Sequence, residues 1–171
     1  MEPDAQTVDG AKRQAYRYLA SRSQTRRELR DRLQGRGYTV GVIDNVLRAL
    51  EAEGYVDDRK FALNWARYRL QNKPIGRRRL AWELQRRGVP FESVEEVLRE
   101  VYSEFDEVAL AEQAMLKRLR FKGGLQSPRE RQRYARYLFS LGFDADTIAA
   151  ALAATSPSMA TLDVVSDDDP C

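Results

Sequence analysis

The feature that most constrains this chain is a pattern of apolar residues and glycine that occurs three times. Leu29, Leu33 and Gly37 are matched 51 positions later, and those positions are matched again 54 positions further on. The matching residues are Leu80, Leu84 and Gly88, and then Tyr134, Leu138 and Gly142. A second apolar group follows each time, at Ile43, Val46 and Leu47, at Val94, Val97 and Leu98, and at Ile148, Ala151 and Leu152. Self-similarity at a period of about 50 residues predicts a series of structural repeats.

Each repeat has the signals of three helices. Apolar residues at i and i+4 form a stripe on one helix face, and the glycine after the stripe suits a left-handed helix end. Residues 25–28 and 127–130 have the spacing of a capping box, with Pro128 at the first helical position, and residues 73–76 mark the corresponding start in the second repeat. No stretch alternates like a strand, so the expected fold is all-α. The predicted helices are 11–21, 25–36, 39–53, 57–72, 76–87, 90–102, 106–121, 127–141 and 144–154.

A unit of this size buries too little surface to be comfortably stable alone, so neighbouring repeats are expected to share apolar surface. The sequence therefore predicts an elongated array of three tandem three-helix repeats. We expect a flexible N-terminus over 1–10, repeats over 11–56, 57–104 and 105–154, and a disordered acidic tail over 155–171, which is rich in Ser, Thr, Asp and Pro.

The fourth predicted helix, 57–72, is apolar on two sides. Phe61, Trp65 and Tyr68 share one face, and Leu63 and Leu70 share the opposite face. A helix with two apolar faces is expected between two packed neighbours. We therefore predict that the three aromatic side chains lie in the core.

Composition excludes several classes of protein. The chain has no histidine, which excludes imidazole bases and His-ligated zinc. Its one cysteine, Cys171, cannot form an internal disulfide, which fits a cytoplasmic protein. No apolar run approaches the 18 or so residues of a membrane span, and no secretory signal is visible at the N-terminus. The acidic residues of 91–112 fit a solvated helix face, so we expect no catalytic residues, no metal and no cofactor.

The charges follow the repeats. The formal net charge is +3, but residues 155–171 carry four Asp and no basic residue, which leaves 29 basic against 22 acidic side chains, a net charge of +7, on the rest. Residues 59–90 hold ten basic and one acidic side chain, 91–112 hold eight acidic and one basic, and 113–140 hold eight basic and one acidic. In a stacked array this alternation predicts an anionic flank and a cationic ridge, the latter formed by the basic side chains of helices 76–87 and 127–141.

Evenly spaced arginines on one face can follow a phosphate backbone or an acidic protein groove. Taken singly, each arginine is better explained as a solvated surface residue, but their clustering favours binding. Trp82 lies among them and could stack on a base or pack against the next repeat. The candidate residues for binding a partner or nucleic acid are Arg77, Arg78, Arg79, Trp82, Arg86, Arg87, Lys117, Arg118, Arg120, Arg129, Arg133 and Arg136.

Three segments carry a resemblance to a known family. They are RYLASRSQTRREL at 17–29, EGYVDDRKFA at 53–62 and GRRRLAWELQRRGV at 76–89. With them the chain, from about 11 to 154, resembles the RecX family of bacterial recombination regulators. It departs from the family pattern at Thr25, where Ser is usual, at Arg77, where Pro is frequent, and at Trp82, a position that is usually polar.

The resemblance implies three tandem three-helix repeats and a regulatory, non-enzymatic activity. It implies binding to the RecA recombinase in the groove of its nucleoprotein filament. It also implies restraint of the ATPase, strand-exchange and co-protease activities of RecA in recombination, DNA repair and the SOS response. The expected partners are the RecA filament, single-stranded DNA and, as a second DNA partner, double-stranded DNA. We expect a monomer that makes no contact with a membrane.

An alternative is a stand-alone helical DNA-binding protein whose repeats act as helix-turn-helix readers. Base readout requires Asn, Gln or Arg at the start of a recognition helix. The third helices begin instead near 39–41, 90–92 and 144–146, with the sequences TVG, PFE and DAD. A strong preference for one duplex sequence would favour this alternative.

Overall fold

The computed structural model of the chain describes residues 7–122 and 127–155. Over these residues the protein consists of nine α-helices and contains no strand, which confirms the predicted all-α fold. Every helix lies within three residues of its predicted bounds. The helices are α1 Val8–Ser21, α2 Arg26–Gln34, α3 Val40–Ala52, α4 Asp58–Asn72, α5 Arg77–Arg86, α6 Phe91–Glu104, α7 Glu107–Lys122, α8 Pro128–Ser140 and α9 Ala145–Ala154.

The first helix begins three residues earlier than predicted. The side chain of Thr7 accepts a 3.1 Å hydrogen bond from the backbone N–H of Gly10, and Gly10 is buried. Val8–Gly10 thus belong to the folded part of the chain. The remainder of the predicted flexible N-terminus, 1–6, and nearly all of the predicted tail, 156–171, lie outside the described residues.

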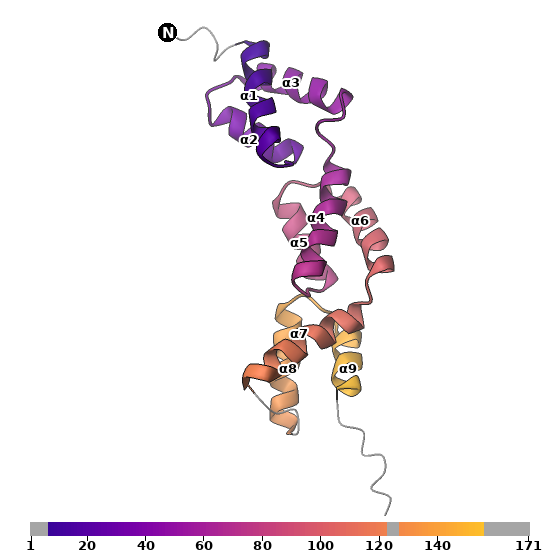
Figure 1. Cartoon of the computed structure of the whole chain (residues 1–171). Coiled ribbons are helices and arrows are strands. Elements are labelled where there is room, and N and C mark those ends of the chain that lie inside the picture. The colour runs from indigo at the N-terminus through magenta and orange to yellow at the C-terminus, as the bar shows by residue number, and fades with distance from the viewer. Residues whose placement is uncertain (1–6, 123–126, 156–171) are drawn as a thin grey trace, which may run out of the picture.

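The helices pack in consecutive groups of three. Helices α1, α2 and α3 contact one another, α4 and α5 pack on α6, and α7 and α8 pack on α9. We call these groups repeat 1, repeat 2 and repeat 3. They follow one another along an elongated rod, with repeat 1 at one end and α9 near the other (Figure 1).

The repeated sequence pattern forms the interior of each group. The stripe residues of α2, α5 and α8 are completely buried. The glycine after each of these helices has a positive φ of 87–90°, as predicted for a left-handed helix end. The apolar group that follows is also buried in all three repeats. The array therefore arises because one short sequence pattern, present three times, gives each repeat the same buried positions and the same turn.

The apolar core is divided unevenly along the rod. Repeat 1 has a core of its own, which includes Leu29, Leu33 and Leu50. Repeats 2 and 3 share one continuous core, which joins residues such as Leu84 of α5 to Phe143 before α9. The junction between repeats 2 and 3 is thus closed by apolar packing, whereas the junction between repeats 1 and 2 is not.

One predicted core residue is exposed. Phe61, Leu63 and Leu70 are buried and Trp65 is half-buried, but Tyr68 is 60% exposed, so its assignment to the core was wrong. The aromatic face of α4 borders a cleft of about 250 Å³ whose opposite wall includes Arg22 of repeat 1. Repeat 1 therefore covers this face only in part.

Candidate partner-binding site

The middle helices of the three repeats, α2, α5 and α8, follow one another end to end. The hydroxyl of Thr25, just before α2, donates a 2.6 Å hydrogen bond to the carbonyl oxygen of Arg87, just after α5. In the same way the N–H of Gly76, just before α5, donates to the carbonyl oxygen of Leu141, just after α8, at 3.0 Å. Figure 1 shows the three helices on the same side of the rod. This arrangement aligns the helices that carry the candidate arginines of repeats 2 and 3.

Glycine is required at the second of these contacts. A Cβ atom on Gly76 would lie 2.3 Å from the carbonyl oxygen of Gly142, a distance too short for a carbon and an oxygen atom that are not bonded. The corresponding position in repeat 1 is Thr25, whose side chain is fully buried and makes the contact itself. The two junctions therefore join equivalent helix ends, but a side chain makes the contact at the first junction and the backbone makes it at the second.

A carboxylate reinforces each junction. The N–H of Arg26, the first residue of α2, donates to Oδ1 of Asp58 at 2.7 Å. The N–H of Arg77, the first residue of α5, donates to Oε1 of Glu107 at 3.0 Å. Asp58 and Glu107 are themselves the first residues of α4 and α7, so each carboxylate satisfies a free N–H at the start of a helix in the preceding repeat.

Burial raises the pKa of the Asp58 carboxyl group above its ordinary value, against the opposing effect of the hydrogen bond from Arg26. Sequence analysis did not identify Asp58 or Glu107 as junction residues. The available signal was an acidic residue at the same position in the first helix of repeats 2 and 3.

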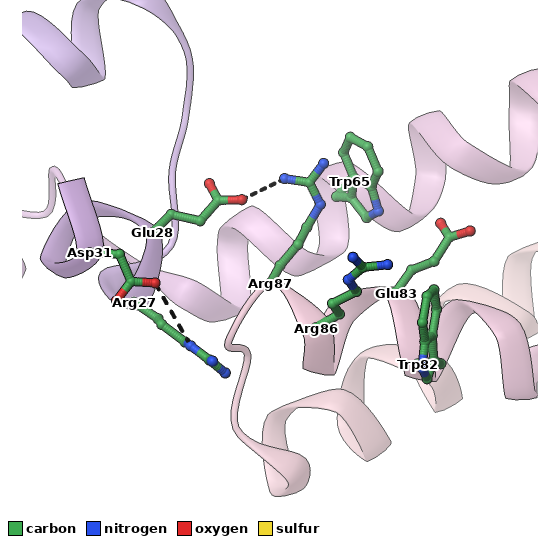
Figure 2. Close-up of a pocket in the computed structure, with 8 residues that line it drawn as sticks. All are labelled: Arg27, Glu28, Asp31, Trp65, Trp82, Glu83, Arg86 and Arg87. Atoms are coloured by element: carbon green, nitrogen blue, oxygen red, sulfur yellow. Dashed lines mark hydrogen bonds and ion pairs between the residues drawn. The ribbon is translucent and has the colours of Figure 1, made fainter. Parts of the chain in front are cut away.

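Two of the candidate arginines serve these junctions. The guanidinium of Arg87 stacks on the ring of Trp65, 3.8 Å from its centroid, and its Nη1 donates to Oε1 of Glu28 at 2.7 Å. Figure 2 shows Arg87 between Glu28 of repeat 1 and Trp65 of α4. The guanidinium of Arg77 pairs with Glu107 at 2.8 Å. Arg77 and Arg87 therefore link repeats, although sequence analysis grouped them with the binding residues.

Trp82 lies at the surface of α5 with two cations beside its ring. Its side chain is 51% exposed, and the guanidinium carbons of Arg79 and Arg86 lie 5.9 and 5.2 Å from the ring centroid. A cleft of about 420 Å³ between α2 and α5 opens next to it (Figure 2). The exposed fraction favours a surface role for Trp82 over packing against a neighbouring repeat.

Glu83 positions one of these cations. Its carboxylate accepts hydrogen bonds from Arg69 at 2.8 and 2.9 Å and pairs with Arg79 at 3.3 Å. Burial alone would raise the pKa of Glu83, but the hydrogen bonds and the charge of Arg69 hold it below its ordinary value. Glu83 therefore stays ionised and keeps the Arg79 guanidinium near Trp82.

Arg78 extends the line of cations toward repeat 3. Its side chain is exposed, and its guanidinium carbon lies 4.8 Å from the centroid of the Phe139 ring on α8. Beside it is a cleft of about 340 Å³. The lining residues of this cleft are Arg77, Arg78, Ala81, Glu95, Leu98 and Arg99.

The candidate residues of α7 differ in exposure. Lys117 is exposed. The guanidinium of Arg118 lies 4.1 Å from the centroid of the Tyr137 ring, and its Nε is buried without a hydrogen-bond partner among the described residues. The side chain of Arg120 lies outside the part of the chain that the structure describes.

The candidate residues of α8 are exposed along one side of the helix. Arg129, Arg133 and Arg136 all have exposed side chains. The guanidinium carbon of Arg133 lies 5.5 Å from the Tyr134 ring centroid, and Nε of Arg136 donates to the carbonyl oxygen of Gln132 at 3.4 Å. With Arg78, Arg79 and Arg86 of α5, these three residues form the exposed part of the cationic ridge.

The predicted anionic flank is partly neutralised. Arg59 of α4 pairs with Glu100 of α6 at 2.7 Å, and Arg67 pairs with Glu100 at 3.2 Å and hydrogen-bonds Glu104 at 3.0 Å. These contacts form a seam of ion pairs between α4 and α6. Glu92 and Glu95 remain exposed on α6. At least three of the ten basic residues of 59–90 thus join helices of repeat 2, because Arg69 of α4 likewise pairs with Glu83 of α5.

Within residues 7–122 and 127–155, no helix is both long enough and apolar enough to cross a membrane. Over the same residues, no group of three His, Cys, Asp or Glu side chains could hold a metal ion.

Comparison with known proteins places this array in a family. A family model described as "RecX, first three-helix domain" matches residues 11–50, and "RecX, second three-helix domain" matches residues 57–98. The regulatory protein RecX of Prosthecochloris aestuarii is 37% identical over 135 residues, which cover 79% of this chain and 86% of that protein. This chain belongs to the RecX family. The RecX protein of Halorhodospira halophila is similarly related, at 38% identity over 82% of this chain and 84% of its own length.

Other members of the RecX family add local and structural detail. The RecX protein of Mycobacterium marinum is 49% identical over 73 residues, which cover 43% of this chain and 42% of that protein. The crystal structure of RecX from Lactobacillus salivarius superposes with a TM-score of 0.78 over 86% of this chain and 95% of that chain, at 19% identity. That likeness shows the helical-array fold, and the curated relatives are named as regulatory proteins.

Proposed function

We propose that this RecX-family protein regulates the RecA recombinase by lying along its nucleoprotein filament and restraining its ATPase, strand-exchange and co-protease activities. The observation that carries the proposal is the end-to-end line of α2, α5 and α8, because it sets exposed arginines of two repeats on one side of a rod. A rod of this kind can touch several subunits of a polymer at once. Several weak contacts to one polymer add as avidity.

The proposed contact surface is the exposed part of the cationic ridge together with Trp82. Lys117, Arg118 and Arg120 of α7 remain candidate binding residues. Arg77 and Arg87 support it indirectly because they hold the repeats in register. If the ridge neutralises phosphates, the logarithm of the DNA affinity falls by about 0.7–0.9 per neutralised phosphate for each tenfold increase in salt.

Trp82 has a defined place in this proposal. A base that stacks on its ring meets the guanidinium groups of Arg79 and Arg86, which lie within 6 Å of the ring centroid. One of these cations must swing aside and is then free to contact the adjoining phosphate. We therefore expect Trp82 and Arg86 to act together on single-stranded DNA.

We further propose that the protein acts as a monomer in the cytoplasm. The start of α8 differs from the starts of α2 and α5. The N-termini of α2 and α5 are satisfied by residues of the next repeat. The N-terminus of α8 instead has a complete capping box between Ser127 and Glu130. Its first residue, Pro128, has no N–H, so the start of α8 is capped from within repeat 3.

The proposal is tested by reversing two exposed charges of the ridge. The variant Arg78→Glu/Arg86→Glu is compared with Arg17→Glu/Arg48→Glu, which changes the net charge equally on exposed residues of α1 and α3. Co-sedimentation with preformed RecA filaments and the RecA ATPase rate are measured. We expect the first variant to lose most of its binding and inhibition at an unchanged melting temperature, and the second to keep both. Full inhibition by the first variant would refute this placement of the contact surface.

The same measurements also distinguish a regulator of RecA from a stand-alone DNA-binding protein. Wild-type protein that binds DNA with a strong sequence preference, and leaves the RecA ATPase rate unchanged, would favour that alternative. Binding that depends on the filament and tolerates any DNA sequence supports regulation of the recombinase.

A further inference from the structure

The two junctions of the rod are held together by different kinds of contact. Between repeats 2 and 3, Ile75 and Phe143 are completely buried in one shared apolar core. In that core the hydroxyl of Tyr102 donates to the carbonyl oxygen of Ile75 at 3.0 Å. Between repeats 1 and 2 the buried residues fall into separate clusters, with Val56 on the repeat 1 side and Phe61 on the repeat 2 side. Only the second junction therefore gains stability from continuous apolar burial.

Apart from the close packing of the Arg27 side chain on Gly88, the contacts across the first junction are polar. The hydroxyl of Thr25 bonds the Arg87 carbonyl oxygen, the N–H of Arg26 bonds Asp58, and the Glu28 carboxylate pairs with the Arg87 guanidinium. The last two side chains are 19% and 24% exposed, so salt and water reach the pair. Such contacts fix the closed geometry, but they exchange readily with water when the junction opens.

The first junction also leaves polar atoms poorly satisfied. Among the described residues, four buried side-chain polar atoms have no hydrogen-bond partner, and three of them lie here. They are Gln24 Oε1, Trp65 Nε1 and Glu28 Oε2, of which the last has only an ion pair with Nη1 of Arg22 at 3.5 Å. Burial of an unpaired polar group disfavours the closed state, because water would satisfy the same atom. The closed state of the first junction therefore carries a local free-energy penalty.

Clefts open on both sides of the same contact. One, of about 420 Å³, separates Arg27 and Asp31 of α2 from Trp82 of α5. The other, of about 250 Å³, separates Arg22 and Ser23 from the aromatic face of α4. Arg87 and Trp65 line both clefts, so repeat 1 rests on repeat 2 through a narrow contact around this stacked pair (Figure 2).

From these observations we infer that repeat 1 is a hinged arm on a rigid body formed by repeats 2 and 3. The Glu28–Arg87 pair, stacked on Trp65, is the latch, and the short connection between α3 and α4, residues 53–57, is the pivot. Opening the latch frees the Arg87 guanidinium and uncovers the Trp65 ring. An arm that turns independently lets the rod follow a curved or helical partner without breaking its second junction.

The test measures distances in the full-length chain without any partner, so its outcome is separate from that of the proposed function. All variants carry Cys171→Ser, which removes the only native thiol. Spin labels are placed at exposed positions as Val40→Cys with Glu92→Cys across the first junction, and as Glu92→Cys with Ala149→Cys across the second. We expect the pulsed EPR distance distribution across the first junction to be at least twice as wide as that across the second.

The first junction is then weakened in two latch variants: Arg87→Gln removes the ion pair with Glu28, and Thr25→Val, a milder change, removes the neighbouring hydrogen bond to the Arg87 carbonyl oxygen. Each is expected to widen the first distribution further and leave the second unchanged, and 1 M salt should act in the same direction. The matched control at the other junction, Arg77→Gln, should widen neither, because the apolar core holds repeats 2 and 3 together. A first distribution as narrow as the second, and unchanged in both latch variants, would overturn the hinge.

Trp65 supplies an independent readout. In a Trp82→Phe background it is the only tryptophan of the chain. We expect Arg87→Gln to shift its emission to longer wavelength and to raise its quenching by acrylamide at least twofold, with unchanged helical circular dichroism. Unchanged emission and quenching in both Arg87→Gln and Thr25→Val would contradict an opening at this latch.

Discussion

The hydroxyl of Thr25 donates a 2.6 Å hydrogen bond to the carbonyl oxygen of Arg87, 62 residues further along the chain. The oxygen atom of that Thr25 hydroxyl also accepts a 3.1 Å hydrogen bond from the N–H of Glu28 and so caps α2. Because Thr25 is completely buried, both bonds are shielded from water. One hydroxyl group therefore starts a helix and also fixes the end of the middle helix in the next repeat.

Replacing Thr25 with Val should remove both bonds while keeping the shape of the side chain. Loss of the cap and of the inter-repeat bond is expected to lower the free energy of unfolding by about 1–3 kcal/mol. Urea denaturation measures this change. Thr39→Val is the matched control, since Thr39 also precedes a helix but is exposed and makes no capping bond, and it should change stability by less than about 0.5 kcal/mol. Equal effects of the two substitutions would contradict the dual role of Thr25.

Gly76 should tolerate no side chain. Its φ of −85° is accessible to any residue, so Gly76→Ala introduces only the clash with the carbonyl oxygen of Gly142. The resulting displacement at the second junction is expected to cost about 1–3 kcal/mol. Gly41→Ala, in α3 with nothing within 4 Å of the new Cβ, should instead be neutral or stabilise the chain by up to about 1 kcal/mol. The melting temperatures of the two variants should therefore shift by different amounts in thermal unfolding. An unchanged melting temperature for Gly76→Ala would show that α5 and α8 do not meet this closely.

Two carboxylates should respond to pH in opposite directions. Burial raises the pKa of Asp58 in the folded protein, so this group disfavours folding above its raised pKa, and that penalty is relieved as pH falls through it. Asp58→Asn keeps an oxygen acceptor for the Arg26 N–H and removes the buried charge. We expect it to leave stability at pH 7 within about 1 kcal/mol of wild type, on the stabilising side. Denaturation at pH 7 and pH 4 measures the difference, which should shrink at the lower pH.

Glu83 should show the opposite pH dependence to Asp58. Its pKa is held below the ordinary value, so its contribution to stability is present above the ordinary glutamate pKa of about 4.3 and is lost as pH falls through the lowered value. Glu83→Gln should therefore cost about 1–3 kcal/mol at pH 7 and progressively less below pH 4. A pH-independent loss would indicate that Glu83 acts through packing rather than through its ion pairs with Arg69 and Arg79.

The helices were predictable because their signals are local. The stripe at Leu80 and Leu84 and the glycine at Gly88 repeat within each unit, and a short window of sequence contains all the information needed. The capping box at 127–130 was also predicted and is complete in the structure, where Oε2 of Glu130 accepts a 3.0 Å hydrogen bond from the N–H of Ser127.

The junctions were not predictable from such windows. At 25–28 only the Thr25 half of the expected capping box forms, because the Glu28 side chain binds Arg87 of the next repeat instead. Tyr68 matches the apolar face of α4 in sequence but lies at an open cleft, since burial depends on where repeat 1 comes to rest. Contacts between residues some 60 positions apart thus decide which arginines face outward and which hold the repeats together.

The divided core has a consequence for local unfolding. Leu33 of α2 and Leu84 of α5 occupy equivalent positions and are both completely buried, but they belong to different apolar clusters. Leu→Ala at such a site costs about 2–5 kcal/mol. Leu33→Ala should therefore raise amide hydrogen exchange in α1–α3 and leave α4–α9 protected, whereas Leu84→Ala should raise exchange throughout α4–α9 and spare α1–α3. Leu116→Ala, at a half-exposed position of α7, is the control and should alter neither group. Exchange that rises equally over all nine described helices in both core variants would mean that the polar first junction transmits unfolding as strongly as an apolar core does.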